Sequence, residues 1–192
     1  MYEKVLNKKY NKIDFTRPKK EKKLPQIIDK DYLLSKINAI NNLKHKAIIS
    51  LGYSVGLRVS EVINLKISDI DSKRMIIIIK QAKGRKDRIV PLLNHILFLL
   101  REYYIQYKPK EYLFNGQSKL QYSASSCNKI VKCYLGKIYH FHQLRHSSFT
   151  SMYEAGTDIY TIQKIAGHNS QKTTQIYTQI STKTLKGAKL PL

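Results

Sequence analysis

Apolar residues recur at three- and four-residue intervals along most of the chain after Leu24, which is the spacing of one face of a helix. Asp29 lies where an N-cap residue belongs, just before the first of these stretches. The apolar positions of that stretch are Leu33, Leu34, Ile37 and Ile40. A second helix is expected over 43–55, with Gly56 ending it in a left-handed conformation.

Shorter helices are expected beyond that glycine. Ser60 is a suitable N-cap for a helix through Leu65, which would hold the backbone of Arg58 between two helix ends. Further helical patterns cover 94–107, 123–135, 142–154, 158–166 and 170–179. Gly156 and Gly167 each follow a helical stretch, so the last third of the chain predicts three short helices separated by tight turns.

Two segments favour strands instead. The run 75–79 is Met followed by four isoleucines, β-branched and too short for a helix, and Arg-Ile-Val-Pro at 88–91 is a second candidate. The residues between them include the basic sequence Lys-Gly-Arg-Lys-Asp at 83–87, which predicts a hairpin turn. The pattern therefore predicts a mostly α protein of the α+β class with one small antiparallel sheet.

Charge divides the chain of 192 residues into two parts. Residues 1–24 are polar and basic with little apolar periodicity, which predicts an arm or an interdomain linker, and the globular domain is expected over 25–192. Lys and Arg outnumber Asp and Glu by 35 to 13, and the formal net charge of +22 is self-repulsive in a compact body. A polyanionic partner would relieve this repulsion, and nucleic acid is the leading candidate because neutralised phosphates release counterions.

Other classes of protein are disfavoured by the sequence. No window reaches the eighteen or so apolar residues of a membrane span, and the N-terminus lacks the apolar core of a signal peptide, so a cytoplasmic protein is expected. Cys127 and Cys133 match neither a disulfide framework nor a zinc-ligand spacing. His140, His142 and His146 have no carboxylate or thiolate close in sequence, so a metal site is not expected.

Several residues with chemical potential occur in short motifs. His142 and Arg145 lie three residues apart, on one face of a helix near its N-terminus. His168 follows a glycine turn, and Tyr177 comes nine residues later. Arg58 supplies a second arginine far upstream.

Together these segments resemble the catalytic domain of the tyrosine recombinase (phage integrase) family. That family shows an arginine in a Gly-Leu-Arg-x-Ser-Glu segment, found here at 56–61, and a His-x-Leu-Arg-His box, found at 142–146. Its third motif, Gly-His followed by Thr-Thr-x-x-Tyr, occurs here within 167–177. The resemblance extends from Leu24 to the C-terminus and implies a mostly α fold with a three-stranded antiparallel sheet.

The resemblance implies a role for each matching residue. The catalytic set would be Arg58, Lys83, His142, Arg145, His168 and Tyr177. Two guanidinium groups suit the charge that develops on the non-bridging oxygens of a phosphodiester, and Tyr177 would be the nucleophile. A phenol with a pKa of about 10 needs nearby cations or a base such as His142. Lys83 would protonate the departing 5′ oxygen, while His168 would add a hydrogen bond to the phosphate.

The same resemblance implies the partners of the chain. They are double-stranded DNA and other copies of the chain, in a tetrameric synapse where residues 181–192 pack against a neighbour, with no cofactor or metal. Whether Tyr177 acts in its own protomer or in a neighbour is left open by the motifs. The basic arm at 1–24 is similar to the linker that follows a separate DNA-clamping domain in many members of the family, which favours an isolated catalytic fragment over a naturally one-domain protein.

Two other functions remain as hypotheses. A type IB topoisomerase shares the tyrosyl chemistry but relaxes supercoils, and the spacing of the segments here argues against it. A catalytically silent DNA-binding module is the alternative from another class, and the complete set of six residues disfavours it. His146 is interpreted as a packing or supporting residue, and the apolar stripe of Ile159, Ile162, Ile165 and Ala166 as core.

Overall fold

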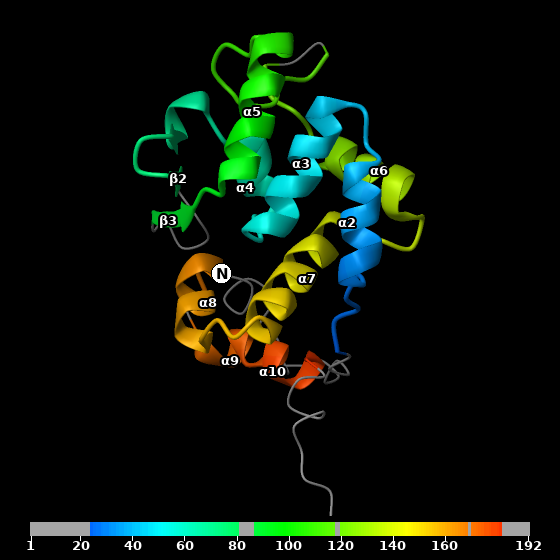
Figure 1. Cartoon of the computed structure of the whole chain (residues 1–192), viewed down its shortest axis with the longest axis vertical. Coiled ribbons are helices and arrows are strands. Elements are labelled where there is room, and N and C mark those ends of the chain that lie inside the picture. Colours follow the sequence, from blue (N-terminus) through cyan, green and yellow to red (C-terminus); the bar gives the residue numbers. More distant parts are fainter. Residues whose placement is uncertain (1–23, 81–86, 118–119, 169, 182–192) are drawn as a thin grey trace, which may run out of the picture.

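The computed structural model describes residues 24–80, 87–117, 120–168 and 170–181, and it confirms a mostly α protein with a small antiparallel sheet (Figure 1). The helices are α2 Lys30–Asn38, α3 Leu43–Ser54, α4 Val59–Asn64, the 3-10 turn η1 Ile67–Asp69, α5 Asn94–Tyr107, α6 Ala124–Leu135, α7 Phe141–Glu154, α8 Ile159–Ala166, α9 Gln171–Thr174 and α10 Ile176–Ile180. The strands are β1 Ile70–Asp71, β2 Ile76–Ile79 and β3 Arg88–Pro91.

Polar side chains begin several of these helices where the sequence predicts them. The carboxylate of Asp29 accepts a hydrogen bond of 2.8 Å from the backbone N–H of Tyr32 and caps α2. Ser123 and Asp158 cap α6 and α8 in the same way. Gly56 follows α3 with a φ of 64°, a left-handed conformation that glycine adopts without steric cost, as predicted.

The start of α4 differs from the prediction. The N-cap is Arg58, and Ser60 lies exposed inside the helix. The cause is the third helical residue, Glu61, whose Oε2 accepts a hydrogen bond of 2.8 Å from the backbone N–H of Arg58. This contact starts the helix two residues earlier and makes Arg58 part of the helix end.

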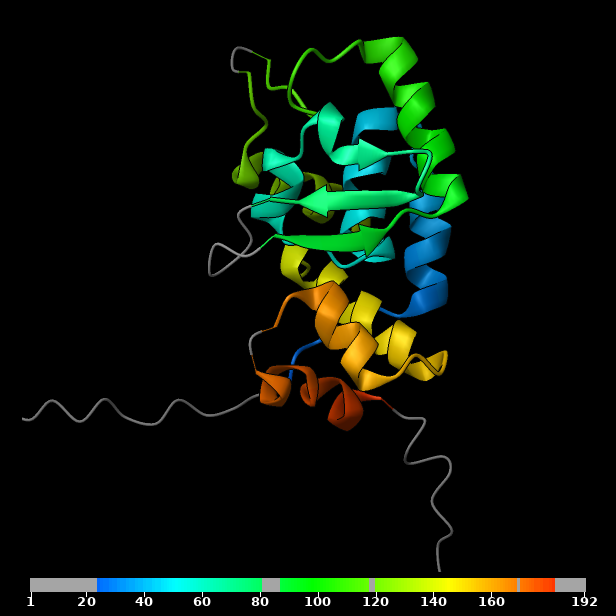
Figure 2. The same ribbon diagram turned by 90° about the vertical axis from the view of Figure 1, so that its left-hand side faces the viewer.

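The sheet has the order β1-β2-β3, and both pairs of neighbours are antiparallel. Strand β2 lies in the middle, with Ile77 facing Val90 of β3 and Ile70 of β1. The sequence located β2 and β3, whereas β1 has only two residues and left no recognisable pattern. Figure 2 views the three strands side by side, with α8 next to the β3 edge. The predicted hairpin turn, including Lys83, lies outside the described residues.

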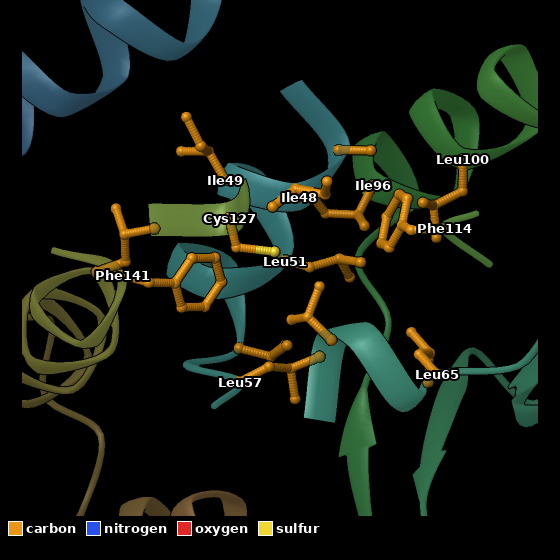
Figure 3. Close-up of a cluster of buried hydrophobic side chains, with 14 of the residues drawn as sticks. Ile48, Ile49, Leu51, Leu57, Leu65, Ile96, Leu100, Phe114, Cys127 and Phe141 are labelled. Carbon is orange, nitrogen blue, oxygen red and sulfur yellow. The ribbon is translucent and has the colours of Figure 1, made fainter. Parts of the chain in front are cut away.

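Helix α3 runs through the middle of the main hydrophobic core. Its side chains Ile48, Ile49 and Leu51 are fully buried, and they gather with residues of α5, α6 and α7 (Figure 3). The thiol of Cys127 is part of this core, and burial raises its pKa to about 12. Cys133, six residues farther along α6, is exposed.

In Figure 1 helix α8 lies beside α7, and α9 and α10 lie below both, so that α8, α9 and α10 form a second layer against α7. A smaller apolar cluster joins them to α7, and it contains Phe149, Ile162, Ala166 and Tyr177. The prediction of one helix over 170–179 is wrong, because the chain forms α9 and α10 with a break at Gln175. Tyr177, near the start of α10, packs against Phe149 of α7 in this cluster.

In the described part of the chain, every helix is too short or too polar to cross a lipid bilayer.

Candidate active site

A pocket of about 410 Å³ lies between α7, the N-terminal end of α4 and the layer formed by α8, α9 and α10. It is lined by Arg58, His142, Arg145, His146, Gly167, His168, Ser170, Thr173, Ile176 and Tyr177. These residues are spread over the sequence from position 58 to position 177. The fold therefore brings three separate motifs to one site.

Arg145 lies at the base of this pocket, with only 1% of its surface exposed. Its guanidinium donates to the carbonyl oxygen of Gly56 and, over 2.6 Å, to that of Ala166. The same group lies 4.7 Å from the centre of the Phe149 ring. Burial first, and then the charge of Arg58, lowers the pKa of Arg145 to about 10, so it stays charged at neutral pH. Among the described residues no carboxylate forms a hydrogen bond with this buried cation, an arrangement that favours an anionic ligand.

Arg58 is held by a buried carboxylate. Glu61 accepts 2.7 Å hydrogen bonds from Arg58 Nη1 and from Arg88 Nη1, and a 2.8 Å bond from Arg88 Nη2. Burial alone would raise the pKa of Glu61, yet Arg88 and Arg58 outweigh it and lower that pKa to about 2. Arg88 also donates from Nε to the carbonyl oxygen of Ile165, 2.8 Å away, and so ties strand β3 to the end of α8.

The turn after α8 fits against these two arginines. Gly167 has a φ of 61°, and Arg58 Nη2 lies 3.5 Å from its carbonyl oxygen. A Cβ at this position would lie 2.9 Å from Cδ of Arg88. Glycine is therefore required here both by the left-handed backbone and by the close approach of a side chain. The turn delivers His168 to the pocket.

His168 is oriented by two partners. Its Nε2 lies 3.1 Å from Arg145 Nη2, and its Nδ1 lies 3.0 Å from the hydroxyl oxygen of Thr174. Because a guanidinium can only donate, Nε2 accepts, and Nδ1 must carry the proton and donate to Thr174. Burial, followed by the charge of Arg145, lowers the pKa of His168 to about 4, so this neutral tautomer persists at pH 7. His168 thus contacts Arg145 directly, a pairing that its sequence position did not predict.

Tyr177 projects from α10 into the same pocket. Its side chain is almost fully buried, with its ring 15° from parallel to that of His168 and packed edge-on against Phe149. The hydroxyl lies 3.4 Å from Nδ1 of His146. Burial raises the pKa of Tyr177 to about 12, although the charges of Arg145 and Arg58 act in the opposite direction.

His142 and His146 occupy one face of α7, one turn apart. Their rings meet at 84° with centres 4.5 Å apart. His142 is the more exposed of the two, and partial desolvation followed by the charges of Arg145 and Arg58 lowers its pKa. Burial, followed by the charges of His142 and Arg145, lowers the pKa of His146 to about 4.

Five of the six residues predicted to form the site line this one pocket: Arg58, His142, Arg145, His168 and Tyr177. Lys83 lies outside the described residues. Sequence reasoning missed Glu61 and Arg88, whose contact joins positions 27 residues apart. It also interpreted His146 as a packing or supporting residue and left it out of the site, although the four-residue step from His142 signals a shared helix face.

Among the described residues, no group of three or more His, Cys, Asp or Glu side chains is arranged to hold a metal ion. The pocket is built instead from guanidinium, imidazole and phenol groups. This set can bind a singly charged anion between Arg58 and Arg145 and present a phenol to it.

Comparison with known sequences gives a consistent result. The sequence model of the phage integrase family matches residues 16–184. Tyrosine recombinase XerA of Pyrococcus horikoshii is 39% identical over 180 residues, which cover 89% of this chain and 62% of the relative. The putative integrase/recombinase y4qK of Sinorhizobium fredii is 38% identical over 173 residues, which cover 86% of this chain and 56% of the relative.

Solved structures agree. A crystal structure of XerA recombinase matches with a TM-score of 0.76 and 32% identity, over 85% of this chain and 64% of the other. XerH site-specific recombinase bound to a palindromic difH substrate, in a post-cleavage complex, also matches with a TM-score of 0.76, at 28% identity and over 85% and 52% of the two chains. The chain thus spans less than two thirds of each of these four proteins.

Proposed function

Because this chain belongs to the phage integrase family, we propose that it is the catalytic part of a site-specific DNA recombinase that cuts and rejoins DNA through Tyr177. The observation that carries the proposal is the convergence of Tyr177, Arg58 and Arg145 on one pocket. A phenol between two permanent cations is suited to attack on a phosphodiester. No activated cofactor is needed for such an exchange of one ester for another.

Binding of the scissile phosphate falls to the two arginines. Each planar guanidinium group matches the geometry of the non-bridging oxygens. Its stabilising interaction strengthens as negative charge builds up on those oxygens in the transition state. Arg145 is fixed by two backbone carbonyl groups and by His168, while Arg58 is fixed by Glu61. Side chains held in this way need little reorganisation when the phosphate enters.

The chemical step replaces one phosphate ester by another. The oxygen of Tyr177 attacks phosphorus, the bond from phosphorus to the 5′ oxygen breaks, and a 3′-phosphotyrosyl link forms. The phenol loses a proton and the 5′ oxygen gains one, which we assign to Lys83 by its family position. A 5′ hydroxyl from another strand can then reverse the attack, so cutting and joining are one reaction in two directions.

The partner proposed is double-stranded DNA, consistent with a net charge of +22 and with the DNA-bound XerH relative. We propose that copies of the protein assemble into a tetrameric synapse in the cytoplasm, with residues 181–192 packing against a neighbour. The relatives are longer than this chain, which favours a catalytic domain preceded by a basic linker at 1–24.

A nicked suicide substrate tests the nucleophile. The chain is expected to form a covalent DNA adduct that resists denaturing detergent and is unaffected by a chelator of divalent metals. Tyr177→Phe should remove the adduct entirely, because the ring remains to fill its buried site while the attacking oxygen is gone. Denaturing gel electrophoresis of labelled DNA provides the measurement.

Tyr160→Phe is the matched control, because that tyrosine is exposed on α8 and lies outside the pocket. It should form the adduct at the wild-type rate. An adduct that persists in Tyr177→Phe would reassign the nucleophile, and binding without any adduct would favour the silent DNA-binding module. Relaxation of a supercoiled plasmid without strand exchange would favour the topoisomerase hypothesis.

A further inference from the structure

The hydroxyl of Tyr177 has a specific partner that is not among the six catalytic residues implied by the family resemblance. Nδ1 of His146 lies 3.4 Å from the phenol oxygen, with ring centres 5.9 Å apart. Within the described residues, this is the one hydrogen bond that the Tyr177 hydroxyl makes. His142, the histidine that the motif would nominate as base, packs against the ring of His146 and makes no hydrogen bond to Tyr177.

The surroundings of His146 keep it neutral and able to accept a proton. The groups that face it are His142 and Arg145 from α7, Tyr177 from α10 and His168 from the turn after α8. Burial and the charges of His142 and Arg145 lower its pKa to about 4. A neutral imidazole whose proton lies on Nε2 presents a lone pair on Nδ1, the atom that faces the phenol.

We infer that His146 is a further catalytic residue, whose Nδ1 accepts the proton of the Tyr177 hydroxyl during strand cleavage. The inference rests on the proposed function and deepens it. As the bond between the phenol oxygen and phosphorus forms, the O–H bond breaks and the proton passes to Nδ1, giving an imidazolium. In the reverse reaction the same proton returns to the departing phenol oxygen. The leaving 5′ oxygen takes its proton from a different group, so the two transfers balance.

Substrate binding strengthens His146 as a base. A phosphate between Arg58 and Arg145 adds a negative charge beside the cation that disfavours protonation of His146. The phenol, with a pKa of about 12, cannot lose its proton before attack, but its acidity rises as its oxygen bonds to phosphorus. Proton transfer therefore occurs only when DNA is bound. In the free enzyme Tyr177 keeps its proton.

Replacement of the imidazole by an amide tests this role. His146→Gln retains a polar side chain but has no nitrogen that can accept the proton. Adduct formation on a nicked substrate is expected to slow by about a hundredfold or more, the usual contribution of a general base. DNA affinity, measured by fluorescence anisotropy, should stay within about twofold, because the hydrogen bond of His146 is to Tyr177 and the two arginines that would bind the phosphate remain.

The chain contains a matched control pair. His45 on α3 has its Nδ1 3.1 Å from the hydroxyl of Tyr134 on α6, with ring centres 5.7 Å apart and a pKa that burial lowers. His45→Gln removes a similar histidine–tyrosine contact outside the pocket. Its adduct rate should equal that of the wild type, which separates loss of the base from loss of packing.

A more acidic phenol distinguishes a base from a structural support. Difluorotyrosine at position 177, introduced by codon reassignment, should recover roughly tenfold or more of the rate that His146→Gln loses. The same residue in the wild-type background should give little or no gain. Equal effects of fluorination in both backgrounds, or a wild-type adduct rate in His146→Gln, would overturn the inference.

A measurement on the unaltered histidine covers the case in which His146→Gln does not fold. The ring nitrogens of ¹⁵N-labelled His146 should shift when Tyr177 is changed to Phe, because the hydrogen bond from the phenol hydroxyl to Nδ1 is lost. Unchanged Nδ1 resonances would refute the contact. Failure of the proposed function itself is a separate outcome, since the wild-type chain would then form no adduct.

Discussion

At the scale of single residues, Glu61 determines the geometry of the site although it was not among the predicted residues. Its two carboxylate oxygens accept hydrogen bonds from the guanidinium groups of Arg58 and Arg88, and its side chain is only 6% exposed. A buried carboxylate flanked by two guanidinium groups cannot be removed without leaving excess positive charge out of water. Glu61 is therefore a positioning residue for Arg58.

Replacement of this carboxylate predicts a pH-dependent loss of stability. Glu61→Gln should lower the free energy of unfolding by about 3 kcal/mol at pH 7. The folded-state pKa, near 2, is below the ordinary value of 4.5, so the carboxylate stabilises the fold above about pH 4.5. That contribution is lost as the pH falls from 4.5 toward 2. The difference in free energy of unfolding between wild type and Glu61→Gln should therefore become smaller. Urea unfolding of the wild type and of Glu61→Gln at pH 7 and at pH 3 measures the free-energy difference at each pH.

Glu111→Gln is the companion variant. Its carboxylate pairs with Lys66 at the surface, where 53% of the Glu111 side chain is exposed, and the change should leave the free energy of unfolding nearly unchanged because water screens the pair. If the loss in free energy of unfolding caused by Glu61→Gln did not depend on pH, it could not be assigned to ionisation of the Glu61 carboxylate.

At the scale of elements, the turn between α8 and α9 carries part of the site. Gly167 ends α8 with a left-handed backbone, and its next neighbour, His168, contacts Arg145 and stacks on Tyr177. The tight fit of Gly167 against Arg88 fixes the distance between α8 and the sheet. The conformation of the turn and the placement of the histidine are thus coupled.

Gly167→Ala tests this coupling. The positive φ should cost about 1–2 kcal/mol of stability, and the clash with Arg88 should displace the turn. Adduct formation should slow by roughly tenfold, because small displacements of catalytic groups are costly. Gly136→Ala, with a φ of 117° and no side chain closer than 3.7 Å to the new Cβ, should lower stability without changing the adduct rate. Thermal unfolding and a time course on nicked DNA measure the two effects.

At the scale of the whole molecule, the positive charge predicts a strong dependence of DNA binding on salt. A protein that neutralises about six phosphates should lose roughly a thousandfold in affinity between 50 and 200 mM salt. The net charge of +22 is sufficient for such a contact. Anisotropy titrations over this range give the slope, and binding that is independent of salt would contradict a phosphate-dominated interface.

The sequence predicted most helices of the molecule because their apolar spacing and their caps are local properties. The resemblance implied a third strand, but the pattern did not locate β1, which depends on pairing with β2, or the break at Gln175. The residues of the site were found through motifs, whereas the contacts between them were not. Arg145 reaches Gly56 across 89 positions and Arg88 reaches Glu61 across 27, and no periodicity reports such pairs.

The two cysteines on α6 differ in exposure, so their reactivity can report unfolding of the chain. Cys133 is exposed and Cys127 is enclosed in the core, with a pKa near 12 that suppresses its thiolate. A maleimide dye will therefore label one position in the native protein and both positions once the chain opens. Mass spectrometry of pulse-labelled samples can then count opened molecules for each variant in the same tube as the DNA assay.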